Sequence, residues 1–303
     1  MLKALKWLVV VLAILAGSLF VWGFFVGAKR LAVIKQVAYV ANLPLEWVGK
    51  RVAFISDLQI GMWGNNESTI RRAISVLVHE RPDLVLIGGD FTDDPAEHPE
   101  EIAESVAIVA PLTQNRIRTF AVLGNHDYSI EEKEEWEEQK KPEAANRLSE
   151  ELTKIGITVL HNDAQPVTLH DGGEPIYVVG LGPHWANEDR PVLALRSVPP
   201  IAPRIVFMHN PDSFAALPAN AASFAIGGHT HGGQIRIPYM PNWSWLTFEK
   251  ESEVHADGWI PDYGEMGNAL YVNRGLGMSE VPIRINAEPE ITMFVLSATK
   301  VSH

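Results

Sequence analysis

The sequence predicts an α/β fold in which a second sheet packs on the first, preceded by one transmembrane helix. Three observations support this fold class. Residues 7–28 form one uncharged apolar stretch, short apolar runs then alternate with helical patterns, and the later part of the chain is richer in strand-like segments. The chain has 303 residues, which is enough to bury one large core.

The N-terminal segment is long enough to cross a membrane. As a helix, residues 7–28 extend roughly 33 Å at about 1.5 Å per residue, and lysine and arginine residues flank them on both sides. We expect an uncleaved anchor over residues 1–36. The alternative is a signal peptide, because Val26-Gly27-Ala28 resembles a cleavage site. The flanking charges nearly balance, and we expect the rest of the chain on the periplasmic or extracellular side.

A folded domain is expected over residues 51–303, joined to the anchor by a linker at 37–50. Buried strands are predicted where short apolar runs end in glycine or polar residues, and helices are predicted at 67–80 and 99–112. The strand-like runs are "RVAFIS", "LVLIGG", "IRTFAVLG", "IYVVGLG", "RIVFMHN" and "SFAIGG", followed by "NALYVNRG" and "PEITMFVLS".

Charge and composition exclude several classes of function. The chain contains no cysteine, so disulfides, thiolate metal ligands and cysteine nucleophiles are absent. Beyond residue 36 it has 20 basic residues against 37 acidic ones. Because this charge repels a phosphate backbone, a general nucleic-acid binder is disfavoured, and a phosphate substrate would need a bound cation to attract it.

Polar side chains gather where five of the predicted strands end. In an open α/β sheet the carboxyl ends of the strands converge, so these side chains are expected to form one site. Carboxylates, amides and imidazoles suit intermediate or hard cations such as Mn²⁺, Fe or Zn²⁺. The residues are Asp57 and Gln59; Asp90; Asn125, His126 and Asp127; His209; His229 and His231.

This series of motifs resembles the calcineurin-like metallophosphoesterase family. The family pattern D-x-H, G-D, G-N-H-D/E, H and G-H-x-H is matched in order by "SDLQ", "GGDF", "GNHD", "MHNP" and "GGHTHGGQ". The segments "GHTHGGQIRIP" and "LYVNRGLG" are similar to its membrane-associated bacterial branch, which includes YkuE and YaeI. The resemblance implies a four-layer α/β/β/α sandwich of two mixed sheets.

The resemblance also implies a site for two divalent metal ions. Position by position, Asp57, Gln59, Asp90 and His231 correspond to ligands of the first metal, and Asp90, Asn125, His209 and His229 to ligands of the second. The chain departs from the family at Gln59, where most members have histidine. A neutral amide oxygen shifts preference from Zn²⁺ toward Mn²⁺ or Mg²⁺, so Mn²⁺ is the expected ion.

The predicted activity is hydrolysis of a phosphodiester or pyrophosphate by in-line attack of a metal-bridging hydroxide. The resemblance implies that His126 faces the substrate, and Asp127 is expected to orient a neighbouring histidine. Arg236 and Arg274 could bind a distal phosphate, or could be surface arginines. The membrane anchor makes a lipid-linked substrate a candidate. The alternatives are a phosphomonoesterase and a metal-binding envelope module without turnover.

Overall fold

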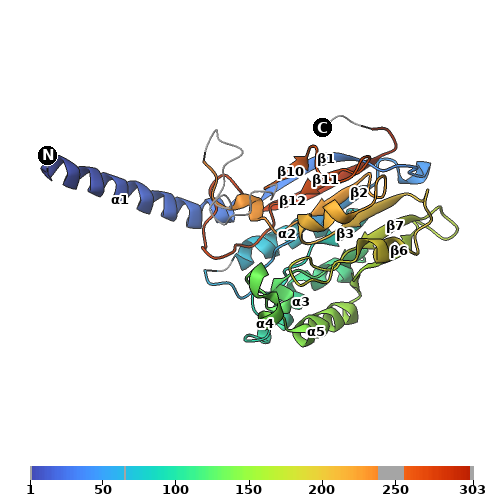
Figure 1. Ribbon diagram of the computed structural model, residues 1–303, viewed down its shortest axis with the longest axis horizontal. Coiled ribbons are helices and arrows are strands. Elements are labelled where there is room, and N and C mark those ends of the chain that lie inside the picture. The colour runs from blue at the N-terminus through green and yellow to red at the C-terminus, as the bar shows by residue number, and fades with distance from the viewer. Residues whose placement is uncertain (1, 65, 238–255, 301–303) are drawn as a thin grey trace.

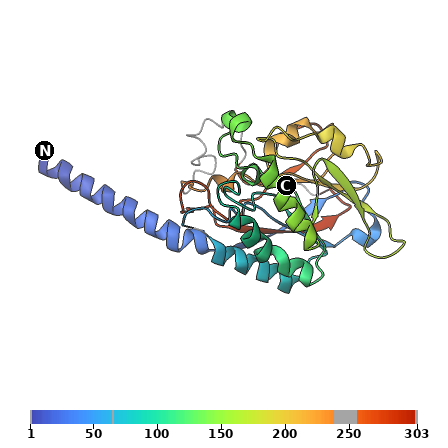
Figure 2. The ribbon, with the colours of Figure 1, turned by 90° about the horizontal axis from the view of Figure 1, so that it is seen from below.

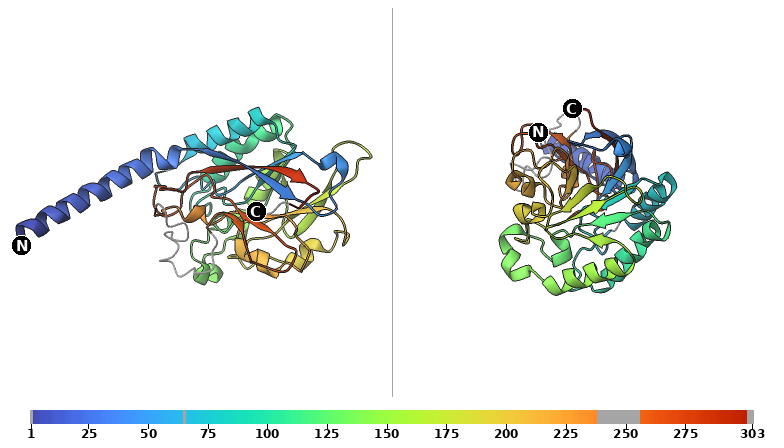
Figure 3. Two further views of the ribbon diagram at one scale, coloured as in Figure 1. Left: turned by 90° about the horizontal axis from the view of Figure 1, so that it is seen from above. Right: turned by 90° about the vertical axis from the view of Figure 1, so that its right-hand side faces the viewer.

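The computed structural model describes residues 2–64, 66–237 and 256–300. A long N-terminal helix, α1 (Leu2–Phe25), projects from one end of a folded domain (Figure 1). Figures 2 and 3 show the same projection from other sides. Within the described ranges, one segment, Leu2–Lys29, is long and apolar enough to cross a membrane by length and composition.

The domain contains two six-stranded sheets. The first has the strand order β1-β12-β2-β3-β4-β5 and the second has the order β10-β11-β9-β8-β7-β6. Strands β2 to β5 are mutually parallel, as are β7, β8, β9 and β11, whereas the pairs β12–β2, β6–β7 and β10–β11 are antiparallel. Both sheets are therefore mixed, as the sequence predicted.

The strand bounds are β1 (Ala32–Tyr39), β2 (Arg51–Ile55), β3 (Leu84–Ile87), β4 (Thr119–Ala121), β5 (Thr158–Val159), β6 (Asp163–Val167), β7 (Ile176–Gly180), β8 (Arg204–Phe207), β9 (Ala225–Gly227), β10 (Gly258–Ile260), β11 (Leu270–Val272) and β12 (Glu290–Ser297). The further α-helices are α2 (Glu67–Glu80), α3 (Glu100–Gln114), α4 (Trp136–Gln139), α5 (Pro142–Lys154) and α6 (Pro191–Leu195). Short 3-10 helices are η1 (Gly27–Lys29), η2 (Leu45–Trp47), η3 (His126–Tyr128), η4 (Lys133–Glu135), η5 (Pro211–Ala216) and η6 (His231–Gly233).

Alternation along the strands produces a four-layer sandwich. In β2, Val52 and Phe54 face the second sheet and pack near Phe207, while Ala53 and Ile55 face the opposite way. That outer face is covered by α2, α3 and α5, and the outer face of the second sheet is covered by α6 and η5 (Figure 3). Successive side chains thus fill two different cores, which explains why these strands are apolar without a break.

The first sheet begins earlier in the chain than the sequence analysis expected. Strand β1 pairs in parallel with β12 over its whole length, from Ala32 beside Glu290 to Tyr39 beside Ser297. It therefore crosses the predicted boundary between the anchor (1–36) and the linker (37–50). Trp47, within the predicted linker, is fully buried in the core between the sheets. Strand β1 therefore belongs to the folded domain from Ala32 onward, because a strand paired along a sheet cannot act as a free connection.

Candidate metal centre

Five parallel strands, three from the first sheet and two from the second, direct their carboxyl ends to one region. The turns after β2, β3 and β4 carry Asp57, Asp90 and Asn125, and the turns after β8 and β9 carry His209 and His229. Apart from Arg51 at the start of β2, the residues of these five strands are buried, so the strand ends are held by both cores. The predicted convergence of these strand ends is what the fold produces.

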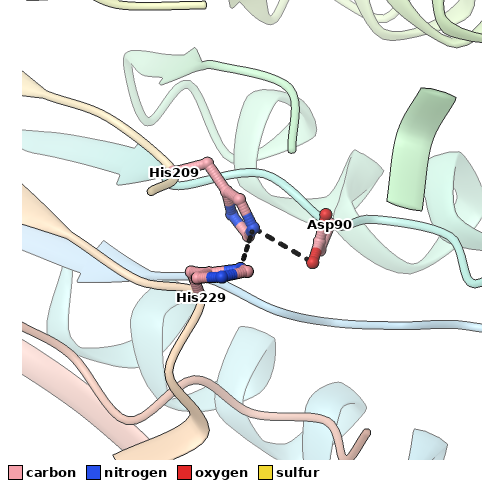
Figure 4. Close-up of side chains that lie close together, drawn as sticks. All are labelled: Asp90, His209 and His229. Carbon is pink, nitrogen blue, oxygen red and sulfur yellow. Dashed lines mark hydrogen bonds and ion pairs between the residues drawn. The ribbon is translucent and has the colours of Figure 1, made fainter. Parts of the chain in front are cut away.

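His209 lies at the centre of the cluster. Its Nε2 atom is 3.1 Å from Oδ2 of Asp90, 3.1 Å from Oδ1 of Asn125 and 3.2 Å from Nδ1 of His229. Its other ring nitrogen, Nδ1, donates to the carbonyl oxygen of Gly88 at 2.8 Å, which fixes the ring and turns Nε2 toward Asp90 (Figure 4). Asp90, His209 and His229 each offer one ligand atom, and these atoms all lie within 4.8 Å of one another.

A second group lies around Asp57. Its Oδ1 atom accepts a hydrogen bond from the backbone N–H of His229 at 2.9 Å and lies 3.8 Å from Nε2 of His231, while Oδ2 is bonded to the hydroxyl of Ser56. This carboxylate therefore links the two sheets directly.

Gln59 follows Asp57 by two residues in the sequence, and its side chain is buried. It is 2% exposed, and neither of its amide atoms has a hydrogen-bond partner within the described parts of the chain. A buried amide without a partner costs about 1–3 kcal/mol, and a ligand for its oxygen would remove part of this cost.

The backbone around both groups is unusual. Five of the seven predicted ligand residues have positive φ angles, a conformation that costs of order 1–3 kcal/mol for a residue other than glycine. They are Asp57 (54°), Gln59 (42°), Asp90 (51°), His229 (73°) and His231 (49°). Glycine is required beside them, since a methyl group at Gly124 would overlap Oδ1 of Asp90 and one at Gly228 would overlap Oγ of Ser56.

Burial and mutual charge set the protonation of these groups. Burial raises the pKa of Asp57 to about 6. Burial alone would lower the pKa of His209, but the carboxylate of Asp90 outweighs it and raises this pKa to about 9. The pKa values of His229 and His231 are lowered well below the usual range, chiefly by burial. These two imidazoles are therefore uncharged at neutral pH, which is the form that binds a cation.

His126 is held beside the cluster by the loop that follows Asp90. Its backbone N–H donates to Oδ1 of Asp90 at 3.0 Å, and its Nδ1 lies 3.0 Å from the carbonyl oxygen of Asp93. Since a carbonyl oxygen only accepts, Nδ1 carries the proton in this contact. Burial lowers the pKa of His126, but the carboxylates of Asp90 and Asp93 raise it above its usual value overall.

The structure corrects the expected role of Asp127. Its carboxylate bonds no histidine among the described contacts. It accepts instead from the backbone N–H groups of Asp90, Phe91, Thr92 and Gly124 and from the hydroxyl of Thr92, at 2.8–3.2 Å. Asp127 thus fixes the turn that carries Asp90 and does not act on an imidazole.

Arg236 and Arg274 lie next to each other and share a carboxylate partner. Asp257 pairs with Arg236 at 2.6 Å and with Arg274 at 3.7 Å, and Arg274 also pairs with the buried Glu290 at 2.8 Å. Both arginine side chains are about 15% exposed. Binding of a distal phosphate to either one would have to replace these ion pairs.

Two further residues support the site from outside the metal-ligand motifs. The ring of Trp185, an aromatic that the sequence offers as a possible pocket residue in "GLGPHWAN", packs edge-on against His229, with ring centroids 4.3 Å apart. Glu101, at the start of α3, accepts from the backbone N–H groups of Asp93 and Asp94 at 3.0 Å, and so supports the loop that holds His126. Its only sequence signal was an acidic residue in the first turn of a helix, which is common at any helix start.

Comparison with known proteins identifies the family. The model of the calcineurin-like phosphoesterase family matches residues 50–233. Phosphodiesterase YaeI of Escherichia coli is 30% identical over 81% of this chain and 82% of its own. The chain belongs to the calcineurin-like phosphoesterase family and is a hydrolase of phosphoester bonds, as the sequence predicted.

Two further relatives cover most of the chain. Metallophosphoesterase YkuE of Bacillus subtilis is 25% identical over 95% of this chain and 93% of its own. UDP-2,3-diacylglucosamine pyrophosphatase LpxG of Chlamydia trachomatis is 29% identical over 83% of this chain and 86% of its own. The likeness to YkuE extends beyond the matched family segment at both ends.

The family is metal-dependent, and the donors present here fit divalent cations. Two buried carboxylates, three imidazoles and a carboxamide oxygen converge without sulfur ligands, which suits Mn²⁺, Fe, Zn²⁺ or Mg²⁺. The unpartnered amide of Gln59 is consistent with the same set.

Glu101 is expected to make stability depend on pH. Burial raises its pKa from 4.5 to about 7, so between these values the folded chain holds a proton that the unfolded chain has lost. This contribution to stability is present below about pH 4.5 and is lost as the pH rises through 7. The charge of Asp93 also raises the pKa of this carboxyl, and the charge of His98 lowers it.

Glu101→Gln removes this titration. Thermal unfolding of the full chain in detergent should show the variant gaining stability relative to the wild type between pH 5 and pH 8. Because other groups titrate in this range in both proteins, the difference between the two curves is the quantity to measure. A constant difference across the range would contradict the assignment.

Proposed function

We propose that this chain is a membrane-anchored phosphoesterase that uses two divalent cations to hydrolyse a phosphodiester or a pyrophosphate. One observation carries the proposal. Side-chain atoms of Asp90, Asn125 and His229 all lie within 3.2 Å of a single imidazole nitrogen, Nε2 of His209. These four residues would hold one cation. Asp57, Gln59 and His231, together with Asp90, would hold the other.

Two bound cations would lower the pKa of an attacking water and neutralise the nonbridging oxygens of the phosphate. The chain's own contribution is to fix the donors before substrate arrives. Asp90 is held by the Asp127 carboxylate, and His209 is held by Gly88. Because both sheets hold the strained backbone of these turns in place, the site needs little rearrangement when charge develops on the phosphate.

His126 is placed to act on the leaving group. Its Nδ1–H is held by Asp93, which leaves Nε2 to carry the second proton of the imidazolium. Since its pKa is raised, the ring is protonated over more of the neutral range than a free histidine and can donate that proton to the leaving oxygen. A site that only stored a metal ion would not need this group.

The proposed substrate class follows from the relatives and from the helix. One relative is named a phosphodiesterase and another a pyrophosphatase of a diacylated sugar nucleotide. Because α1 would keep the site close to a bilayer, a lipid-linked phosphoester is the substrate class we favour. The acidic domain disfavours nucleic acid.

Asn125→Ala should abolish metal-dependent hydrolysis while the chain stays folded. The full chain in detergent, stripped of metal and supplied with Mn²⁺, Zn²⁺ or Mg²⁺, is assayed on bis(p-nitrophenyl) phosphate and on p-nitrophenyl phosphate. Loss of a direct ligand should lower the rate by more than the 10–100-fold that removal of an outer partner costs.

Asn115→Ala is the matched control, because Asn115 is exposed at the end of α3. It should retain the wild-type rate. An Asn125→Ala protein with the same rate as the control would rule out the ligand assignment, and faster turnover of the monoester than of the diester would favour a phosphomonoesterase.

Gln59→His should change metal preference. Imidazole is the stronger donor for Zn²⁺, so the ratio of the Zn²⁺-supported rate to the Mn²⁺-supported rate should rise. The comparison is made on one preparation with each cation added back in turn. An unaltered ratio would show that the Gln59 amide does not bind the cation.

We further propose that the hydrolytic domain lies on the periplasmic or extracellular side. A reporter that is active only after export, fused after His303, should be active in cells that carry the full chain. Activity of a reporter that functions only in the cytoplasm would reverse this assignment.

A further inference from the structure

The end of the apolar helix is packed against the loop that follows β11. The backbone N–H of Arg284 donates to the carbonyl oxygen of Gly23 at 3.2 Å. Gly23 is buried, and a methyl group there would lie 3.0 Å from Cβ of Ile283. At Gly27 a methyl group would overlap the carbonyl oxygen of Arg284. Two residues without side chains thus allow the helix end to lie directly on this loop.

Asn66 ties the same helix end to a second part of the loop that follows β11. Its amide donates to the carbonyl oxygens of Ala28 at 2.7 Å and Leu276 at 2.8 Å and accepts from Nζ of Lys29 at 3.1 Å. Asn66 stands at the N-cap position of α2, but its side chain makes no capping bond there. The segment 23–29, which we call the helix seat, is therefore held by several hydrogen bonds and is not a free tether.

Arg284 connects the helix seat to the predicted ligands. Its side chain is fully buried, and its guanidinium donates to the carbonyl oxygens of Gly277 (2.6 and 2.9 Å), Arg274 (2.8 Å), Ala287 (2.9 Å) and His231 (3.2 Å). The same group places Nη2 3.2 Å from Nδ1 of His231. Among the residues that the structure describes, no carboxylate lies within ion-pair distance of it. A buried charge held this way is costly to keep, which points to a role beyond packing.

The loop held by Arg284 also supports Asp57. The backbone N–H groups of Leu276 and Gly277 donate to the carbonyl oxygens of Ser56 and Asp57. The backbone of Arg284 is hydrogen-bonded to the helix seat. Its side chain holds two segments that carry ligands of the same proposed cation. The group around His209 has no such connection to α1 among the described contacts.

We propose that the helix seat is part of the framework of the hydrolytic site, and that Arg284 is the positioning residue that couples the seating of α1 to Asp57 and His231. The proposal rests on the function proposed above, because it concerns the cation that these two residues would hold. Displacing the helix end should weaken the binding of that cation and leave the binding of the other cation unchanged.

The test uses the full chain in detergent, stripped of metal and titrated with Mn²⁺ by calorimetry, with thermal unfolding followed in parallel. Gly27→Val forces the helix end away from Arg284, and Gly17→Val is the matched control in the same helix, since nothing lies within 4 Å of a side chain at Gly17. Gly27→Val should weaken one of two Mn²⁺ equivalents by about 10–100-fold, the usual effect of disturbing an outer partner. The other equivalent and the control should match the wild type.

Arg284→Lys is the second variant, because it keeps the charge but cannot reach all the carbonyl oxygens. It should show the same selective loss. Wild-type affinity at both sites in folded Gly27→Val and Arg284→Lys proteins would overturn the proposal. Loss of both equivalents together with the thermal transition would assign these residues to folding alone and would also overturn it.

The wild-type titration separates this inference from the function on which it rests. Fewer than two bound Mn²⁺ ions in the wild type would contradict the proposed function, and the inference with it. Two ions bound with wild-type affinity in every variant would contradict only the inference.

Discussion

The whole structure is organised around two carboxylates that are removed from water. Asp57 and Asp90 are no more than 1% exposed, and each lies on a turn at the end of a buried strand. An uncompensated buried carboxylate is very unfavourable, so the surrounding groups have to balance it. Backbone N–H groups, imidazoles and a serine hydroxyl do so here, and they come from both sheets. The charge that the site must hold therefore also joins the two halves of the sandwich.

This constraint explains where the chain departs from ordinary geometry. Left-handed backbone at Asp57, Asp90 and His229 turns side chains sharply back toward the strand ends, and glycines allow neighbouring turns to touch. Such strain persists only where the surrounding structure fixes it, and here both hydrophobic cores end at the same place. Burial of the apolar strands on either side of the site offsets the free-energy cost of this strained backbone.

Much of the fold and of the site could be predicted because the signals are local. Apolar runs that end in "GGD", "GNHD" or "GGHTH" mark both the strand and the residue that follows it. Strand β1 was missed because its partner is β12, at the other end of the chain, and alternate residues along it are exposed. Glu101, Asn66 and Arg284 were not identified as site residues because each acts on a loop through long-range contacts, with no pattern around it. The role of Asp127 was misjudged for the same reason, since its partners are backbone groups that any residue carries.

The most direct test of the account is a crystal structure of the full chain grown with Mn²⁺, with the ions located by their anomalous scattering. The account predicts two peaks about 3.5–4 Å apart, with Asp90 between them and His209 and His231 on opposite sides. A structure with one peak or none beside Asp90, at Mn²⁺ concentrations that support hydrolysis, would contradict the two-cation site.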